Sequence, residues 1–232
     1  MNTRLLLSYL FNIVSIVRFN FHYFPFMQAI KFPVFLKDAK LRVLKGTVKI
    51  ESTSIKPGMI KLGYPNSCMI TQKGFSWLNR GGVIFKGKFK VGNDSVIETT
   101  SDAKLIIGDN VSFNGSFHLT GSNNITIGNN ELGSWNISIF DTDFHRMIDI
   151  NTSQKITSCS SSVIIGDSCW LCMGGTILKG AKLGDYCTLG AESLLVSDLG
   201  KEKYVVAAGN PAKIIKRGVY LNVFDCSPEW HY

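Results

Sequence analysis

Aliphatic side chains recur at every sixth position in the second half of this 232-residue chain. The run lies within IGDSCWLCMGGTILKGAKLGDYCTLGAESLLV and consists of Ile165, Leu171, Ile177, Leu183, Leu189 and Leu195. An α-helix repeats its faces every 3.6 residues and a flat strand every two, so neither holds a period of six over such a length. Glycine directly follows the aliphatic residue at positions 166, 184 and 190, which indicates tight turns. The period therefore predicts a repeating unit of one short strand and one turn.

Three such units close a triangular coil of about eighteen residues, with the aliphatic side chain inside and Gly, Asp or Asn at the corners. Successive coils then stack at the ordinary strand spacing of about 4.8 Å. The same step recurs upstream in Phe85, Val91 and Ile97, in Ile107, Phe113 and Leu119, and from ITIGNN at 125–130. We therefore expect an all-β protein, a solenoid of parallel strands from about residue 40 to residue 200.

The expected organisation has three parts: a leader at 1–40, the solenoid at 41–205 and a C-terminal segment with its tail at 206–232. A loop is expected at about 146–162, because the polar stretch NTSQKITSCSSS has no period. Counting in sixes from Ile127 would place His145 inside the shaft, where an imidazole without a partner is costly. The register therefore breaks near residue 140, and His145 lies at the rim where the loop departs.

The leader contains an uncharged stretch, LLLSYLFNIVSIV at 5–17, between two arginines. Thirteen residues are too few to span a bilayer as a helix, which needs about 20. No small-residue cleavage site of a signal peptide follows. A helix here has one narrow polar stripe, formed by Arg4, Ser8, Asn12 and Ser15. Such a helix either packs against its own protein or another copy, or lies in a membrane interface. We expect packing, with peripheral membrane association through residues 1–30 as the alternative.

Charge and cysteine usage narrow the classes of partner. The net charge of +8 predicts an anionic partner, such as a phosphorylated cofactor, an acidic sugar or a membrane surface. Runs of Lys and Arg do not exceed two residues, so a nucleic-acid-binding arm is not expected. Cys169 and Cys172 form a C-x-x-C, but no second pair follows at zinc-finger spacing. We therefore expect no metal, and free thiols in a cytoplasmic protein.

The stretch FDTDFHRMIDI at 140–150 sets Asp141, Asp143 and His145 at alternate positions. On an extended strand both carboxylates and the imidazole would share one face. An imidazole titrates near neutral pH and can accept a proton from a hydroxyl group, and a neighbouring carboxylate can orient its ring. Geometry on a strand does not separate Asp141 from Asp143 in that role. The competing interpretation is a polar strand edge that faces water.

These features together resemble the hexapeptide-repeat acyltransferases over about residues 40–217. The sixfold repeat is similar to the coil signature of that family, and AAGNPAKIIKR at 207–217 resembles its terminating element. DTDFH at 141–145 stands where the sugar and polysaccharide O-acetyltransferases carry a histidine stretch. The resemblance implies a left-handed parallel β-helix and a homotrimer. It also implies transfer of an acetyl group from acetyl-CoA to a sugar hydroxyl, in the assembly of a bacterial surface polysaccharide such as capsule, O-antigen or exopolysaccharide.

The resemblance implies roles for single residues as well. His145 corresponds to the general base, and Asp143 is its preferred partner. The positions that correspond to the acetyl-CoA site are Trp170, Met173, Ala191, Lys213 and Lys216. Those on the acceptor side are Asn114, Asp141 and Trp170. The segment WLCMGG departs from the usual pattern, because Cys172 and Met173 occupy positions that are usually small.

Two alternatives remain at this point. One is N-acylation of an amino sugar on a nucleotide carrier, and the other is a solenoid without activity that serves as a scaffold. A metal enzyme of the γ-carbonic anhydrase type would need three histidine ligands. Only His118 and His145 lie within the expected solenoid, which disfavours that class.

Overall fold

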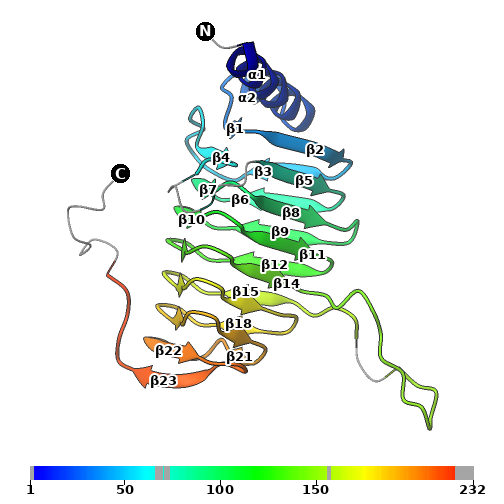
Figure 1. Ribbon diagram of the computed structural model, residues 1–232, viewed down its shortest axis with the longest axis vertical. Helices are drawn as coiled ribbons and strands as arrows, with labels where there is room; N and C mark the ends of the chain where they lie inside the picture. The colour runs from blue at the N-terminus through cyan, green and yellow to red at the C-terminus, as the bar shows by residue number, and fades with distance from the viewer. Residues whose placement is uncertain (1–2, 66–69, 71–73, 156–157, 223–232) are drawn as a thin grey trace.

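The computed structural model describes residues 3–65, 70, 74–155 and 158–222, with side chains from residue 11 onward. Helix α1 (Thr3–Tyr23) and the short helix α2 (Phe26–Ala29) come first, and strands β1 to β23 follow as a stack of coils (Figure 1). The last part of the expected C-terminal segment, from residue 223, lies outside the described residues.

Each coil contributes one strand to each of three sheets, in the order A, B, C. Sheet A consists of β1 (Val34–Leu36), β4 (Ile60–Leu62), β7 (Phe89–Val91), β10 (Val111–Phe113), β13 (Leu132–Gly133), β16 (Trp170–Leu171), β19 (Thr188–Leu189), β22 (Val205–Ala208) and β23 (Lys213–Arg217). Sheet B consists of β2 (Ala39–Leu44), β5 (Phe75–Asn79), β8 (Ser95–Thr99), β11 (His118–Gly121), β14 (Ser138–Phe140), β17 (Thr176–Ile177) and β20 (Leu194–Leu195). Sheet C consists of β3 (Thr47–Ile50), β6 (Gly82–Phe85), β9 (Lys104–Ile107), β12 (Asn124–Ile127), β15 (Val163–Ile165), β18 (Lys182–Leu183) and β21 (Asp198–Leu199).

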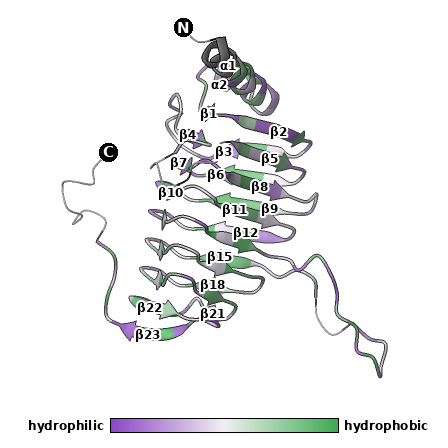
Figure 2. Cartoon of the chain, viewed as in Figure 1, coloured by the Kyte–Doolittle hydropathy of each residue, from purple (hydrophilic) through white to green (hydrophobic). Residues whose placement is uncertain are grey.

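Pairing between successive coils is parallel, except that β23 folds back antiparallel on β22. Along strands such as β1, β5 and β8, fully buried residues alternate with less buried ones. Hydrophobic and hydrophilic residues both occur along the strands (Figure 2). The predicted parallel solenoid is therefore confirmed. It begins at β1, before the boundary at residue 41 that the sequence indicated, because Val34 and Leu36 are already buried beneath the helix.

The residues of the sixfold period form the core, as predicted. All six aliphatic side chains from Ile165 to Leu195 are at most 1% exposed. Position 133 is an exception, since the period places a glycine there. A Cβ on Gly133 would come 2.0 Å from the ring of Phe113 in the coil above, so the larger neighbour fills the inward space. The interior of the coil must be filled to normal packing density, and a glycine beside a phenylalanine fills it as well as two aliphatic residues do.

Helix α1 covers the open end of the first coil. The Asn20 side chain donates to the Val34 carbonyl at 2.8 Å and accepts the Val34 N–H at 3.1 Å. Phe19 is fully buried, with its ring centroid 5.3 Å from that of Trp77. The leader thus packs on its own solenoid, as expected. Across the described segments, no helix combines the length and apolar character needed to cross a membrane.

A long loop leaves the stack at the corner between sheets B and C. It runs from the end of β14 at Phe140 to the start of β15 at Val163, so it begins earlier than the expected residue 146. Isolated antiparallel bridges join Thr142 to Ser160 and Ile148 to Lys155, and the loop forms a narrow arm that extends away from the coils (Figure 1). Ile165 takes the next inward position in place of residue 145, as the predicted break in register requires.

The expectation that 141–145 form an extended strand is wrong. β14 ends at Phe140, and Phe144 has a φ of 61°, which breaks the alternation of faces. Asp141 is fully buried, and its two carboxylate oxygens accept the N–H groups of Ser122 at 2.6 Å and Asn123 at 2.8 Å. Burial raises the pKa of Asp141, against the opposing effect of these two donors. Asp141 thus closes the coil corner, and its assignment to the acceptor is revised.

Replacing Asp141 with Asn should destabilise the fold. The amide nitrogen that replaces one carboxylate oxygen cannot accept a hydrogen bond, so one partly buried N–H loses its partner, at about 1–3 kcal/mol. Urea unfolding followed by circular dichroism measures the difference. The matched control is Asp143→Asn, which changes an exposed carboxylate and should leave the midpoint nearly unchanged. Equal midpoints for both variants would contradict the structural role of Asp141.

Candidate active site

His145 lies on the arm just beyond its root and is exposed to solvent. Within the part of the chain that the structure describes, its ring has no hydrogen bond or ion pair. The carboxylate of Asp143, the expected partner, forms an ion pair with Lys179 instead. Lys179 also donates to the Ser158 carbonyl at 2.7 Å, so one ammonium group contacts both limbs of the arm.

The root of the arm is fixed by backbone hydrogen bonds. The Asp143 N–H donates to the Cys159 carbonyl at 2.9 Å, and the Thr142 hydroxyl donates to the same oxygen at 3.1 Å. The Ser161 N–H donates to the Asp141 carbonyl at 2.9 Å. An exposed imidazole therefore follows a well-anchored segment, which is a suitable place for a group that meets a substrate.

Lys179 was missed by the sequence analysis. It lies at the corner one coil beyond the arm, because Ile139 of β14 pairs with Ile177 of β17. The residue that follows Ile177 by two is then next to the root of the arm. The position of Lys179 beside the arm can be found only when the strand register is known on both sides of the inserted segment.

The outer face of sheet A holds several of the residues expected to contact acetyl-CoA. Trp170 is half-buried and pairs with Thr188, and Thr188 pairs with Val206. Val206 in turn pairs with Lys216 on β23. Paired residues of neighbouring strands share one face of a sheet, so Trp170 and Lys216 lie in one column. Lys213 pairs with Ala208 at the end of β22, and both lysines are exposed.

The corner between sheets A and B holds the remaining candidates. The Glu192 N–H donates to the Met173 carbonyl at 2.8 Å, so Ala191 lies one coil from Met173. Asn114 belongs to the same corner, two coils earlier. Met173 and Ala191 are exposed. The Glu192 carboxylate covers Gly174, where an added Cβ would lie 2.1 Å from its Oε1. The sequence did not indicate that Glu192 lies at this corner.

The candidates therefore fall into two groups within one chain. Trp170, Met173, Ala191 and the two lysines lie on sheet A or at its corner with sheet B. His145 leaves from the opposite edge of sheet B, on an arm that extends away from the coils (Figure 1). One copy of the chain does not bring the imidazole to the other group.

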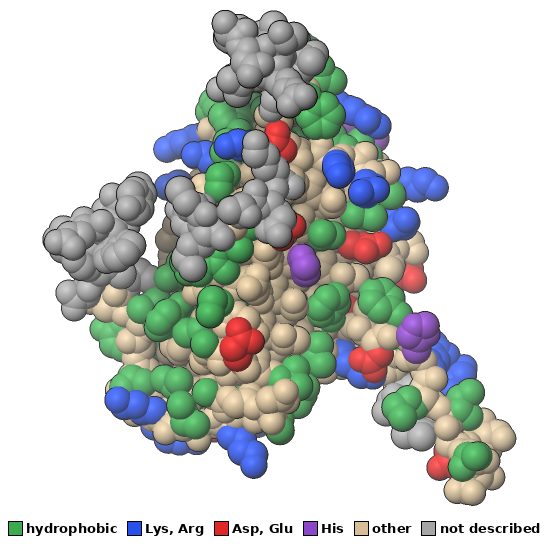
Figure 3. Space-filling view, in the orientation of Figure 1, with side chains coloured by type: hydrophobic (Ala, Val, Ile, Leu, Met, Phe, Trp, Pro, Cys, Tyr) green, Lys and Arg blue, Asp and Glu red, His purple; other side chains and the backbone are tan. Residues whose placement is uncertain are grey.

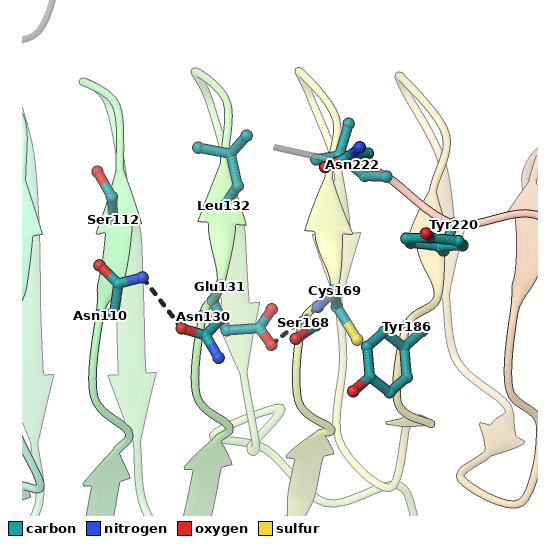
Figure 4. A pocket seen from close by; sticks show the side chains of 11 residues that line it. Asn110, Ser112, Asn130, Glu131, Leu132, Ser168, Cys169, Tyr186, Tyr220 and Asn222 are labelled. Carbon is teal, nitrogen blue, oxygen red and sulfur yellow. Dashed lines mark hydrogen bonds between the residues drawn. The ribbon is translucent and has the colours of Figure 1, made fainter. Parts of the chain in front are cut away.

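A separate cavity of about 550 Å³ lies at the corner between sheets C and A, lined by Asn110, Asn130, Glu131, Tyr186 and Tyr220 among others (Figure 4). None of the predicted site residues lines it. Glu131 is buried, and its Oε1 accepts the Cys169 N–H at 3.0 Å, while its Oε2 has no partner among the described residues. Burial raises the pKa of Glu131 well above its usual range, which favours the neutral acid.

The cysteine pair is not arranged as a metal site. Cys169 points into the coil and is buried, whereas Cys172 is half-buried, and both thiols are free. Burial raises the pKa of Cys169 and of Cys172, so both remain protonated thiols. In the described part of the chain, no three His, Cys, Asp or Glu side chains come together in a way that could hold a metal ion.

Several known acetyltransferases resemble this chain in sequence. No family model matches the sequence. WbbJ of Escherichia coli K12, assigned to lipopolysaccharide biosynthesis as an O-acetyl transferase, is 27% identical over 78% of this chain and 93% of its own length. The polysialic acid O-acetyltransferase of Escherichia coli O1:K1 is 30% identical over 53% of this chain, but only 39% of that protein is covered. WcaF of Escherichia coli K12, assigned as a colanic acid biosynthesis acetyltransferase, is 31% identical over 56% of this chain and 70% of WcaF.

Two solved structures share the fold. The polysialic-acid-specific acetyltransferase NeuO superposes with a TM-score of 0.57 at 24% identity, covering 84% of this chain and 85% of its own. The polysialic acid O-acetyltransferase OatWY gives a TM-score of 0.54 at 20% identity, with 82% and 90% covered. The sixfold core and the match to WcaF agree with one another. The chain therefore belongs to the hexapeptide-repeat acyltransferases, enzymes built on a left-handed parallel β-helix.

Proposed function

We propose that this enzyme transfers the acetyl group of acetyl-CoA to a sugar hydroxyl during the synthesis of a bacterial surface polysaccharide, with His145 as the general base. The observation that carries the proposal is the exposed imidazole beyond an anchored root, in a chain of this family. The relatives named for lipopolysaccharide, polysialic acid and colanic acid support a saccharide acceptor. Two of them are named as O-acetyltransferases, which favours a hydroxyl over an amino group.

The chemistry needs one proton acceptor and no nucleophilic side chain. His145 takes the proton of the acceptor hydroxyl as its oxygen attacks the thioester carbonyl. The new C–O bond forms and the C–S bond breaks, and the leaving thiolate takes the proton from the imidazolium. The products are the acetyl ester and free coenzyme A, with the histidine restored to its starting state.

The residues on sheet A suit the acyl donor. Lys213 and Lys216 are exposed cations on one strand and can pair with the phosphates of acetyl-CoA. Trp170 offers an aromatic face in the same column as Lys216, and Ala191 leaves an open corner beside Met173. Asn114, farther along that corner, is proposed to contact the acceptor.

We further propose a homotrimer in which the arm of one copy reaches the sheet A corner of the next. The arm exposes Phe144, Met147, Ile148 and Ile150 over 58% to 93% of their surfaces. Such a concentration of apolar side chains is unfavourable in water, and a neighbouring copy would cover it. Assembly would also bring His145 to the residues that are distant from it within one chain. We place the reaction in the cytoplasm, because the cysteines at 159, 169, 172 and 187 are free.

The first test is the substitution His145→Ala. It should lower kcat by about 10²–10⁴-fold, because the acceptor hydroxyl loses its proton acceptor. The KM for acetyl-CoA should stay unchanged, since the imidazole does not hold the nucleotide. The control is His118→Ala, which removes an exposed imidazole from β11 and should retain full activity. A folded His145→Ala enzyme with more than about a third of the normal kcat would contradict the assignment.

The second test asks how Asp143 acts. If it places His145 by holding the arm through Lys179, then Asp143→Asn and Lys179→Met should each lower kcat by about tenfold, through misplacement of the base. The double variant should lose no more than Lys179→Met alone, because Asp143→Asn removes only the ion pair that Lys179→Met already removes. Lys179→Arg keeps the charge and should restore most of the rate. Full kcat in Lys179→Met, together with a loss in Asp143→Asn, would show that Asp143 acts on the ring directly.

A further inference from the structure

Helix α1 leaves more apolar side chains exposed than an ordinary surface helix, although its Phe19 is fully buried. Such helices bury their apolar stripe and expose their polar one. In α1 the polar side chains Asn12 and Asn20 face the solenoid, where they bond to the backbone of residues 38 and 34. The outward arc carries Phe11, Ile13, Val14, Val17 and Phe21, which are between 41% and 63% exposed.

The apolar surface continues beyond α1. Phe26 and Met27 of α2 are 66% and 70% exposed, and Ile30 follows at 42%. The rings of Phe21 and Phe26 contact each other edge to face, with centroids 6.1 Å apart, so the two helices share one surface. We call these eight residues the outer apolar face. It lies at the N-terminal end of the solenoid, and the arm leaves after β14, in the C-terminal half of the stack (Figure 1). Exposed apolar surface of this extent marks an interaction site.

The net charge of the chain is concentrated at the same end. Residues 1–62 contain ten Lys and Arg against two acidic residues, Asp38 and Glu51, whereas residues 63–232 contain fifteen of each kind. The whole formal charge of +8 therefore belongs to the leader and the first coils. Several of these cations are exposed around the outer apolar face, namely Arg18, Lys31, Lys40, Arg42, Lys45 and Lys49. Figure 3 shows Lys and Arg side chains on both flanks of this end.

We propose that the outer apolar face binds the surface of an anionic lipid bilayer, with α1 lying in the plane of the interface. The apolar side chains would enter the boundary between headgroups and acyl chains, and the surrounding cations would meet the lipid phosphates. A second copy of the chain is a poorer occupant. Contact of two such faces would bring two strongly basic ends together, and like charges at short range oppose association. This proposal does not depend on the acetyl-transfer reaction.

The test measures binding of the full chain to phospholipid vesicles by sedimentation. One set contains phosphatidylcholine alone, and the other contains phosphatidylcholine with about 30% phosphatidylglycerol. Binding to the anionic set should be at least about tenfold tighter, since each lysine or arginine near such a surface adds to the affinity. Raising the salt to about 0.5 M should remove most of this difference by screening.

Paired variants separate the two contributions. Arg18→Glu with Lys31→Glu should weaken binding to anionic vesicles by about tenfold or more. The control is Lys104→Glu with Lys201→Glu, which makes the same charge change at exposed positions outside residues 1–62 and should have a much smaller effect. Val14→Ser with Phe26→Ser should also weaken binding by about tenfold. Both side chains are largely exposed, so the unfolding midpoint should stay the same.

Three outcomes would overturn the proposal. One is equal affinity for the two sets of vesicles, and another is an absence of binding to either. The third is a fall in the mass of the assembly without lipid on Val14→Ser with Phe26→Ser, while vesicle binding persists. That result would assign the outer apolar face to contact between copies of the chain.

Discussion

Backbone pairing between successive coils governs the structure. Each strand of two to six residues is too short to be stable alone, and it is held by parallel partners in the coils before and after it. This pairing aligns the inward side chains of successive strands in columns, so any insertion must leave at a corner and return in register. The arm between β14 and β15 does so, and Ile165 returns to the sheet C column of Ile127, while Ile177 continues the sheet B column of Ile139. Asp141 closes that corner by accepting two backbone hydrogen bonds inside the coil. The start of the arm is therefore fixed by the coil, and with it the segment that leads to His145.

The sequence predicts the coil well because burial in a solenoid is strictly periodic. Leu171 and Leu183 could be assigned to the shaft without knowledge of their neighbours, and His145 could be assigned to the rim because an imidazole does not belong in that column. The same reasoning failed for Asp141. It assumed that alternation continues past Phe140, whereas the chain bends there and buries the carboxylate against two backbone amides.

Contacts between residues on either side of the inserted arm could not be predicted from the sequence for a similar reason. Lys179 meets Asp143 only because β14 and β17 are adjacent strands of sheet B, and the intervening arm hides that register. Which side of α1 faces the solenoid could also not be predicted from its polar stripe. Asn12 and Asn20 bond to the open backbone of the first coil and take up part of the inner face, so Phe19 is buried beside them while the apolar residues of the outward arc stay exposed. The end of the molecule that caps the solenoid thus differs in net charge from the remainder of the chain, which includes the arm.

We propose that the reaction site forms between two copies, with His145 from one and the sheet A corner from the next. Mixing two inactive variants, His145→Ala and Ala191→Trp, tests for this shared site. In randomly mixed assemblies about a quarter of the interfaces would join an intact histidine arm to an intact corner, so the account predicts recovery of about a quarter of the normal activity. Mixed assemblies confirmed by mass spectrometry, yet no more active than either parent, would contradict a shared site.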